Sequence, residues 1–416
     1  MKLLLSADLH LGRKSSRVGE RSSHTAIACW DRMVTYAIEQ NVNAVLLAGD
    51  VVEQRNKRFE SYGPLNAGVL RLSAAGITTI AVSGNHDFDV LPQLVDSIDA
   101  DMFFLLGRNG WESRVFTFGD QRLQIDGWSF PDKRVSINPL DSYSTEDNDV
   151  DLHLGMVHGD LDASNSKYAP ITAESLSKTK VSGWLLGHIH KPELRNADQP
   201  WSLYPGSPQA FDPGEAGIHG VWLLDTAQNS EPQLVPFSSI CYSSFEIDIT
   251  LCDDESIAGY VAREVKEHGV EIAEQFSSSL GIVSLRPTIV GDCEQPLTVI
   301  QDLKNLTDYQ INEGGVSIEV EKVSWNIREN LRVEDYFGQK NALAKAVRLL
   351  HEFETGEYSS GTSELLANFR SRGAKLSNNY ASIISVEDEL NEESQSEQLK
   401  RQLVNLISTI REQANV

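Results

Sequence analysis

The chain has 416 residues, of which 40% are hydrophobic, and this length and composition predict two folded units and a tail. Its formal net charge of −24 excludes a protein that coats nucleic acid through overall positive charge, because phosphate binding requires Lys and Arg. No run approaches the roughly 20 apolar residues of a membrane span, and four scattered cysteines without a CxxC pair favour a reducing compartment, so we expect a cytoplasmic protein with no membrane segment.

Short apolar runs alternate with helical patterns from residue 1 to about residue 225. Apolar residues recur at helical spacing from Ile27 to Ile38 and from Leu65 to Leu72, between the runs. Strands that alternate with helices and are buried on both faces predict a layered α/β core. The predicted strands are Lys2–Ser6, Ala44–Leu47, Thr79–Val82, Leu152–Val157 and Trp184–Leu186.

Two further segments follow this core, which we place at residues 1–238. Residues 239–330 predict a small α+β domain of three strands and two helices, and they contain no chemical motif. Residues 331–416 predict a helical, strongly polar tail with narrow apolar stripes. One stripe comprises Leu343, Val347 and Leu350, and the other comprises Leu399, Leu403, Leu406 and Ile410.

Metal-binding residue types stand at the end of each of the five predicted strands. Residues two apart on a strand share a face, so Asp8 and His10 together can hold one ion, and His188 and His190 likewise place two imidazoles on a common face. For any one histidine a structural role is at least as plausible. Chance is a poor explanation for the ordered set, whose members are Asp8, His10, Asp50, Asn85, His86, His158, His188 and His190.

Mixed imidazole, carboxylate and amide donors suit Mn²⁺, Fe or Zn²⁺ better than Mg²⁺, which prefers oxygen ligands. Two such ions roughly 3.5–4 Å apart can clamp the attacking and leaving oxygens of a phosphoryl displacement. Metal-dependent hydrolysis of a phosphoester is therefore the predicted reaction, with two divalent ions, of which Mn²⁺ is the expected one.

Basic residues collect on the loops that follow two of these motifs. Each run alone could be an ordinary solvated loop, but both lie beside proposed metal ligands. They therefore predict contacts with a phosphate backbone, chiefly through Arg13, Lys14, Arg55 and Lys57.

The series DLHLGR, AGD, SGNHD, VHGD and GHIH, followed by YPGSPQ, resembles the calcineurin-like metallophosphoesterases. Within them it is similar to the SbcD-type and YhaO-type DNA repair nucleases, bacterial relatives of the meiotic recombination eleven nuclease. The motifs cover residues 1 to about 225. Beyond them the resemblance rests on layout: a small capping domain, then helices that in the family dock on a coiled-coil ABC-type ATPase of the SbcC or YhaN kind.

The resemblance implies a role for each motif residue. Asp8, His10 and His190 would hold one ion, Asn85, His158 and His188 the other, and Asp50 would bridge them. His86 would stand near the scissile phosphate, where it stabilises the transition state or protonates the leaving oxygen, and Asp87 would orient it.

One position departs from the family pattern. Nucleases of this family can carry a histidine shortly after the bridging aspartate that positions the DNA strand, whereas this chain reads Asp50-Val51-Val52-Glu53. Either Glu53 takes that place or the role is absent, which leaves the preference between exonuclease and endonuclease action open.

Hydrolysis of DNA in repair or end processing is thus the expected function, with DNA and the ATPase as partners and a homodimer as a further expectation. A phosphatase or a small-molecule or cyclic-nucleotide phosphodiesterase on the same scaffold is the alternative, because it would keep every metal ligand. A non-catalytic interaction subunit is the second alternative, but no ligand is missing here.

Overall fold

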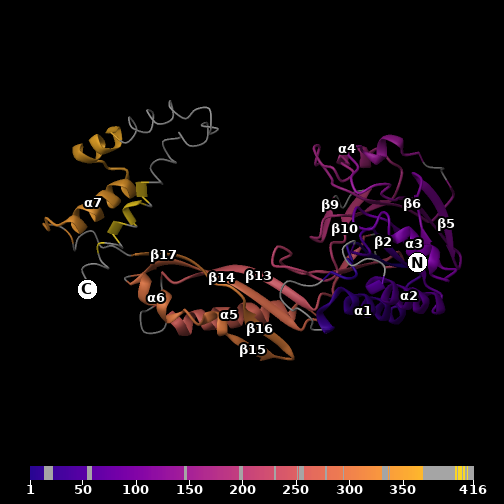
Figure 1. Cartoon of the computed structure of the whole chain (residues 1–416), viewed down its shortest axis with the longest axis horizontal. Coiled ribbons are helices and arrows are strands. Elements are labelled where there is room, and N and C mark those ends of the chain that lie inside the picture. Colours follow the sequence, from indigo (N-terminus) through magenta and orange to yellow (C-terminus); the bar gives the residue numbers. More distant parts are fainter. Residues whose placement is uncertain are drawn as a thin grey trace. The chain divides into compact units, whose positions relative to one another are not determined.

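The computed structural model describes residues 1–13, 22–53, 59–144, 148–195, 200–228, 231–250, 252, 257–276, 279–293, 295–329, 336, 338–368 and part of 399–410. It divides into two compact units, one of Met1–Gly291 with Leu297–Asn326 and one of Asp292–Pro296 with Ile327–Val416. Figure 1 labels the elements of both units. The domain boundaries expected after residues 238 and 330 stay predictions.

The first sheet has six strands in the order β12-β11-β1-β2-β3-β4. The parallel strands β1 (Lys2–Ser6), β2 (Ala44–Ala48) and β3 (Thr78–Val82) are those expected from the sequence, and the short β4 (Phe103–Leu105) extends them. Two antiparallel strands complete the sheet beside β1, namely β11 (Gly220–Asp225) and β12 (Gln233–Pro236).

The second sheet also has six strands, in the order β5-β6-β7-β8-β10-β9. Its parallel centre contains the two other expected strands, β7 (Leu152–His158) and β8 (Gly183–Gly187). The strands around them are β5 (Glu112–Phe118), β6 (Gln121–Trp128), β9 (Glu193–Arg195) and β10 (Trp201–Tyr204).

The two sheets pack face to face around a shared apolar core. Leu3, Leu5 and Leu46 of the first sheet contact this core together with Leu154 and Met156 of the second. Helices α1 (Ala26–Glu39), α2 (Phe59–Ala74) and α3 (Leu91–Ser97) contribute to a second core on the other face of the first sheet, and α1 and α2 lie side by side in Figure 1. The outer face of the second sheet packs on loops and on α4 (Ala173–Ser177). The predicted layered α/β core is thus confirmed.

A third sheet follows, built from β13 (Ile240–Asp248), β14 (Ile282–Cys293), β15 (Gln310–Glu313), β16 (Val316–Val320) and β17 (Ser324–Glu329). Its helices are α5 (Ile257–Glu274) and α6 (Pro296–Asp302). The sequence predicted two helices but only three strands. The described residues form five strands, and the extra ones include the short β15, which carries few apolar residues.

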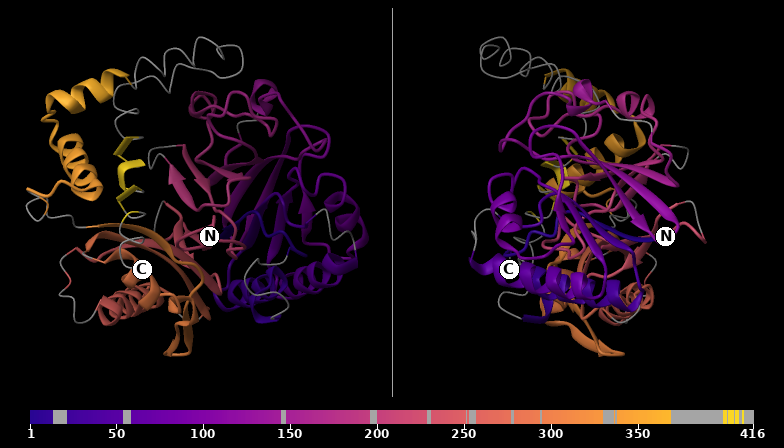
Figure 2. Two further views of the ribbon diagram at one scale, coloured as in Figure 1. Left: turned by 60° about the vertical axis from the view of Figure 1, so that its left-hand side comes forward. Right: turned by 90° about the vertical axis from the view of Figure 1, so that its right-hand side faces the viewer.

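In the second unit, α7 (Ala342–Thr355) begins where the Asn341 side chain accepts a hydrogen bond from the Ala344 N–H and ends at the left-handed Gly356. Its apolar face packs against the second stripe of the tail, and Figure 2 shows this yellow segment beside α7. The two stripes of the tail, for which docking on a partner and packing within the chain were both open, therefore bury one another in part. The residues in these contacts are Leu343, Val347, Leu350, Phe353, Leu399, Leu403 and Ile407. None of the helices in the described part of the chain is long and apolar enough to cross a membrane.

The buried carboxylate of Asp126, on β6, links β5, β7 and the loop that contains Tyr143. Asp126 accepts hydrogen bonds from Ser113 Oγ (2.6 Å), Gln124 Nε2 (3.1 Å), the Tyr143 hydroxyl (2.6 Å) and His153 Nε2 (2.7 Å). Burial would raise the pKa of Asp126, but these donors outweigh burial and lower it to about 2. The charged form is therefore the one that the fold stabilises.

Replacing this carboxylate, Asp126→Ala, is expected to lower the free energy of unfolding by roughly 2 kcal/mol at pH 7, because the donors around it lose a charged acceptor. A carboxylate with a lowered pKa stabilises the fold above its unfolded pKa, and this contribution disappears as the pH falls toward the folded value. The difference in the free energy of unfolding between wild type and variant should therefore become smaller from pH 7 to pH 3. Urea unfolding followed by tryptophan fluorescence measures it, since Trp111 and Trp184 contact Tyr143. Asp132→Ala, at an exposed site, is the control, and an equal loss there would contradict the assignment.

Candidate metal centre

The ends of five strands bring the predicted metal ligands together at one edge of the two sheets. Backbone hydrogen bonds fix the loops that follow β1 and β2 to each other, from Asp8 N–H to the Gly49 carbonyl (3.1 Å) and from His10 N–H to the Asp50 carbonyl (2.9 Å). In the second sheet, Gly159 N–H donates to the Gly187 carbonyl (3.1 Å), which joins the ends of β7 and β8.

Four of these residues have a left-handed backbone that side chains other than glycine rarely adopt. The φ angles are 52° at Asp8, 45° at His10, 50° at Asp50 and 100° at His188. Such conformations cost of order 1–3 kcal/mol each and persist only where the surrounding structure enforces them. Their concentration at these four positions marks the cluster as a functional site.

The first group of ligand atoms belongs to Asp8, His10 and His190, and these atoms lie within 4.8 Å of one another. His10 Nε2 is 3.1 Å from His190 Nε2, and His190 Nε2 is 4.0 Å from Asp8 Oδ1. The side chains of Asp8 and His10 are buried. This is the set expected to hold one ion.

The second group surrounds Asn85, whose Oδ1 lies 3.1 Å from both His158 Nε2 and His188 Nδ1. Asp50 stands between the groups, since its Oδ2 is 3.4 Å from His158 Nε2 and 3.8 Å from His10 Nε2. The structure thus brings together all seven residues expected as ligands, and Asp50 has the place expected of a bridge. Their action as ligands stays a prediction.

The donor set and its electrostatics fit divalent cations. Burial would lower the pKa of His158, but the nearby Asp50 charge outweighs burial and raises it to about 9. The buried negative charge that stabilises a protonated imidazole would also stabilise a metal ion, because a metal ion displaces the proton from the nitrogen that it binds. Imidazole, carboxylate and amide oxygen donors are those that Mn²⁺, Fe and Zn²⁺ accept.

His86 lies beside the cluster with its side chain 41% exposed. Its Nδ1 is 3.1 Å from Glu53 Oε1, while Glu53 Oε2 is 3.2 Å from His10 Nδ1. The hydrogen bond with Glu53 raises the pKa of His86. One carboxylate therefore contacts both a proposed metal ligand and the residue proposed to act on the phosphate.

Asp87 has a different environment from the one expected. Its carboxylate is buried and accepts hydrogen bonds from the backbone N–H groups of Gly84 (2.7 Å), Val51 (2.7 Å) and Val52 (3.3 Å). It therefore braces the loops that follow β2 and β3. In the described contacts, the partner that orients His86 is Glu53 rather than Asp87.

Sequence reasoning did not single out two acidic side chains at the site. Glu215 Oε1 lies 2.6 Å from His190 Nδ1, and Asp160 Oδ1 lies 3.3 Å from His188 Nε2. Asp160 follows His158 closely in the motif VHGD, so that motif carried a signal for it. Glu215 follows no strand and belongs to no regular element, so the sequence pattern gave no signal for it.

The basic loops are described only in part. Arg13 is the one substrate-binding candidate in the described residues, and its Nη2 lies 3.1 Å from Asp212 Oδ2 while its guanidinium stacks on Phe211 at 4.6 Å. Its charge is thus partly compensated within the chain. Lys14, Arg55 and Lys57 lie outside the described residues.

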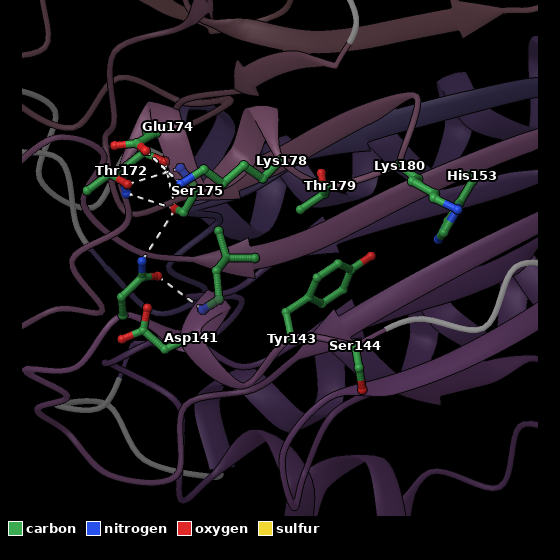
Figure 3. Close-up of a pocket in the computed structure, with 12 residues that line it drawn as sticks. Asp141, Tyr143, Ser144, His153, Thr172, Glu174, Ser175, Lys178, Thr179 and Lys180 are labelled. Carbon is green, nitrogen blue, oxygen red and sulfur yellow. Dashed lines mark hydrogen bonds and ion pairs between the residues drawn. The ribbon is translucent and has the colours of Figure 1, made fainter.

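A separate cavity of about 640 Å³ lies at the other end of β7. Figure 3 shows its wall, where Lys178 contacts Glu174 (2.6 Å) and where Tyr143 and His153 lie near Thr179 and Lys180. His158 lies five positions after His153, or roughly 16 Å along a strand. Within the described part of the chain, none of the groups able to hold a metal ion includes a residue of this wall.

Fold and site together define a metal-dependent phosphoesterase, and a sequence model of the family agrees. The calcineurin-like phosphoesterase superfamily domain matches residues 1–229, so the chain belongs to this superfamily.

Two curated relatives match at low identity. The metallophosphoesterase YhaO of Bacillus subtilis, described as uncharacterized, is 28% identical over 228 residues, which cover 53% of this chain and 56% of that protein. The DNA double-strand break repair protein Mre11 of Haloferax volcanii is 26% identical over 278 residues, which cover 65% of this chain and 59% of that protein. The match thus spans less than two thirds of either relative. The solved structure of a dimetal phosphatase from Danio rerio is 12% identical to this chain, with a TM-score of 0.35, and the match covers 54% of this chain and 91% of that one. A similarity at this level says nothing of activity.

The variant Asp50→Ala is expected to abolish tight binding of divalent ions, because it removes the carboxylate between the two groups. Wild-type protein should bind two Mn²⁺ per chain and show a higher melting temperature with Mn²⁺ than with EDTA, since a ligand that binds only the folded state stabilises it. Calorimetric titration and melting curves measure both. Asp120→Ala, an exposed carboxylate at the β5–β6 turn, should behave as wild type. Two tightly bound ions in Asp50→Ala would show that the site is assigned wrongly.

Proposed function

We propose that this chain is a two-metal phosphodiester hydrolase that acts on DNA. The observation that carries the proposal is the convergence of Asp8, Asp50, Asn85 and the five motif histidines at one edge of the paired sheets. A protein that bound metal only for stability would have no need of an exposed imidazole at the border of such a cluster.

Asp8, His10 and His190 would hold one ion, Asn85, His158 and His188 the other, with Asp50 between them. We assign Mn²⁺ as the ion. Two bound ions would supply the positive charge that activates a water molecule and stabilises the phosphoryl transition state.

The other residues prepare the site for the substrate. His86, half exposed beside the cluster, donates a proton from Nε2 to the leaving oxygen or stabilises charge on the phosphate. Glu53 holds the other nitrogen of that ring and so fixes its direction. The Asp87 carboxylate accepts hydrogen bonds from three backbone N–H groups and so holds the loops that follow β2 and β3 in place.

DNA is favoured as the substrate over a small phosphoester by the relative named for double-strand break repair and by the basic residues next to the metal motifs. The compensated charge of Arg13 favours the alternative, a phosphatase or a small-molecule or cyclic-nucleotide phosphodiesterase. We place Glu53 where related nucleases can carry a strand-positioning histidine. Its contact with His86 supports that placement, and it leaves the choice between exonuclease and endonuclease action to experiment.

For the second unit we propose docking on a coiled-coil ABC-type ATPase, and for the chain a homodimer. The apolar stripes pack on each other, but Tyr358, Leu365 and Leu406 remain 41%, 45% and 48% exposed. We place the contact with the ATPase on these exposed apolar side chains.

His86→Ala is expected to lower the rate of DNA cleavage by roughly 10²–10⁴-fold while two Mn²⁺ per chain stay bound, because the imidazole acts on the phosphate and not on an ion. End-labelled single- and double-stranded DNA and bis-p-nitrophenyl phosphate are the substrates, and metal content is measured on the same samples. Asp50→Ala serves as the inactive reference.

Two results would contradict this assignment. Equal loss of metal and activity in His86→Ala would make His86 a ligand. Cleavage by the wild type of the small ester alone would exclude DNA as the substrate and favour the alternative.

The double variant Leu365→Asp with Leu406→Asp is expected to lose the ATPase from purifications out of the native host and to keep Mn²⁺-dependent hydrolysis of the small ester. The physical reason is that two charges would have to be buried in the proposed interface. Leu70→Asp, 41% exposed on α2, is the matched control and should retain the partner. Retention of the ATPase by the double variant would place the interface elsewhere.

A further inference from the structure

Glu215 lies directly behind the proposed metal ligand His190. Its Oε1 is 2.6 Å from His190 Nδ1, which is the short distance of a charge-assisted hydrogen bond. The other ring nitrogen, Nε2, faces His10 Nε2 at 3.1 Å and Asp8 Oδ1 at 4.0 Å. One side of the ring thus belongs to the metal cluster and the other to Glu215.

The Glu215 carboxylate is itself held in place. Its side chain is only 9% exposed, and Oε2 accepts hydrogen bonds from the Phe211 N–H (2.8 Å) and from Ser207 Oγ (3.1 Å). Arg13 Nη2 lies 3.7 Å from Oε1 and compensates part of its charge. A carboxylate fixed by three neighbours can in turn fix the ring that it contacts.

We propose that Glu215 is the positioning residue for His190. By accepting the proton of Nδ1 it holds the imidazole in the form whose Nε2 carries the free lone pair, and it directs that lone pair toward Asp8 and His10. A histidine that binds a metal through one nitrogen needs its other N–H oriented in this way. The inference rests on the proposed two-metal site and adds to it a residue outside the strand-end motifs.

A purely structural role for Glu215 is the competing explanation. The same hydrogen bonds to Phe211 and Ser207 close the irregular segment from Ser207 to Glu215, so the carboxylate could serve that segment alone. The two explanations differ in what they predict for metal affinity. A positioning role changes the affinity of one site, whereas a structural role changes the melting temperature of the metal-free protein.

The experiment uses Glu215→Gln in the full chain, because glutamine keeps the volume and a hydrogen-bond acceptor but removes the charge. Mn²⁺ binding is measured through the electron paramagnetic resonance signal of the free ion, and melting temperature is measured in EDTA. We expect one of two Mn²⁺ sites to weaken by roughly 10–100-fold while the other keeps its affinity. The Mn²⁺ concentration for half-maximal hydrolysis of bis-p-nitrophenyl phosphate should rise in parallel, and the rate at saturating Mn²⁺ should largely recover.

Two further variants separate position from charge and from loop structure. Glu215→Asp keeps the charge and should restore part of the lost affinity. Ser207→Ala removes a second partner of Glu215 and leaves both the Glu215–His190 contact and the backbone hydrogen bond from Ser207 to His190 in place. It should lower the metal-free melting temperature while the Mn²⁺ affinity stays close to that of wild type. Unchanged affinity in Glu215→Gln, or an equal loss of affinity in Ser207→Ala, would overturn the inference. If wild-type protein binds no Mn²⁺, the proposed function itself fails, which the wild-type titration shows before any variant is compared.

Discussion

The site depends on one close approach between the two sheets, at the ends of β2 and β8. A Cβ atom at Gly187 would lie 1.9 Å from the Ala48 carbonyl oxygen and 2.4 Å from His158 Nδ1, so only glycine allows the backbones to meet there. This approach lets imidazoles of the second sheet reach carboxylates of the first. Gly84 plays the same part beside Asp50, where a Cβ would lie 2.2 Å from Oδ1. The glycines in the motifs GN and GH thus have a steric reason.

Strain and charge are concentrated where the sheets meet. Asp8, Asp50 and Asp87 are buried within one small volume, and the burial of like charges is costly unless cations or hydrogen bonds compensate them. Burial and the Asp50 charge raise the pKa of Asp87 against the opposite effect of its backbone N–H donors. The proposed metal ions would compensate this buried negative charge, and they would allow a chain of net charge −24 to attract a phosphate there.

Five central strands and the convergence of the motif side chains could be predicted from the sequence, because both follow from local rules. Strands buried on both faces read as apolar runs, and parallel strands place their ends at one edge. The edge strands β9 and β12, half exposed and short, carry no such run and were not predicted, and neither were the largely buried strands β6, β10 and β11. The contacts of Asp87 and Glu215 could not be predicted from the sequence. Loops from distant parts of the chain decide whether such an acidic side chain contacts a histidine or a backbone amide. No periodicity along the sequence encodes that choice.

The imidazoles of the site share a feature that follows from those long-range contacts. Each has one nitrogen toward the cluster and the other near an oxygen. His158 Nδ1 and His190 Nδ1 lie at hydrogen-bond distance from the Ala48 carbonyl (3.1 Å) and Glu215 (2.6 Å), and His10 Nδ1 and His188 Nε2 lie at ion-pair distance from Glu53 (3.2 Å) and Asp160 (3.3 Å). A ring held on its outer side loses little freedom when its inner nitrogen binds an ion, so the entropy cost of assembling the centre is met during folding. His86 is held by Glu53 in the same way but is half exposed, and its free nitrogen is available to a substrate. An oxygen atom on the outer side of each ring would therefore serve both the proposed metal binding and the chemistry proposed for the phosphate.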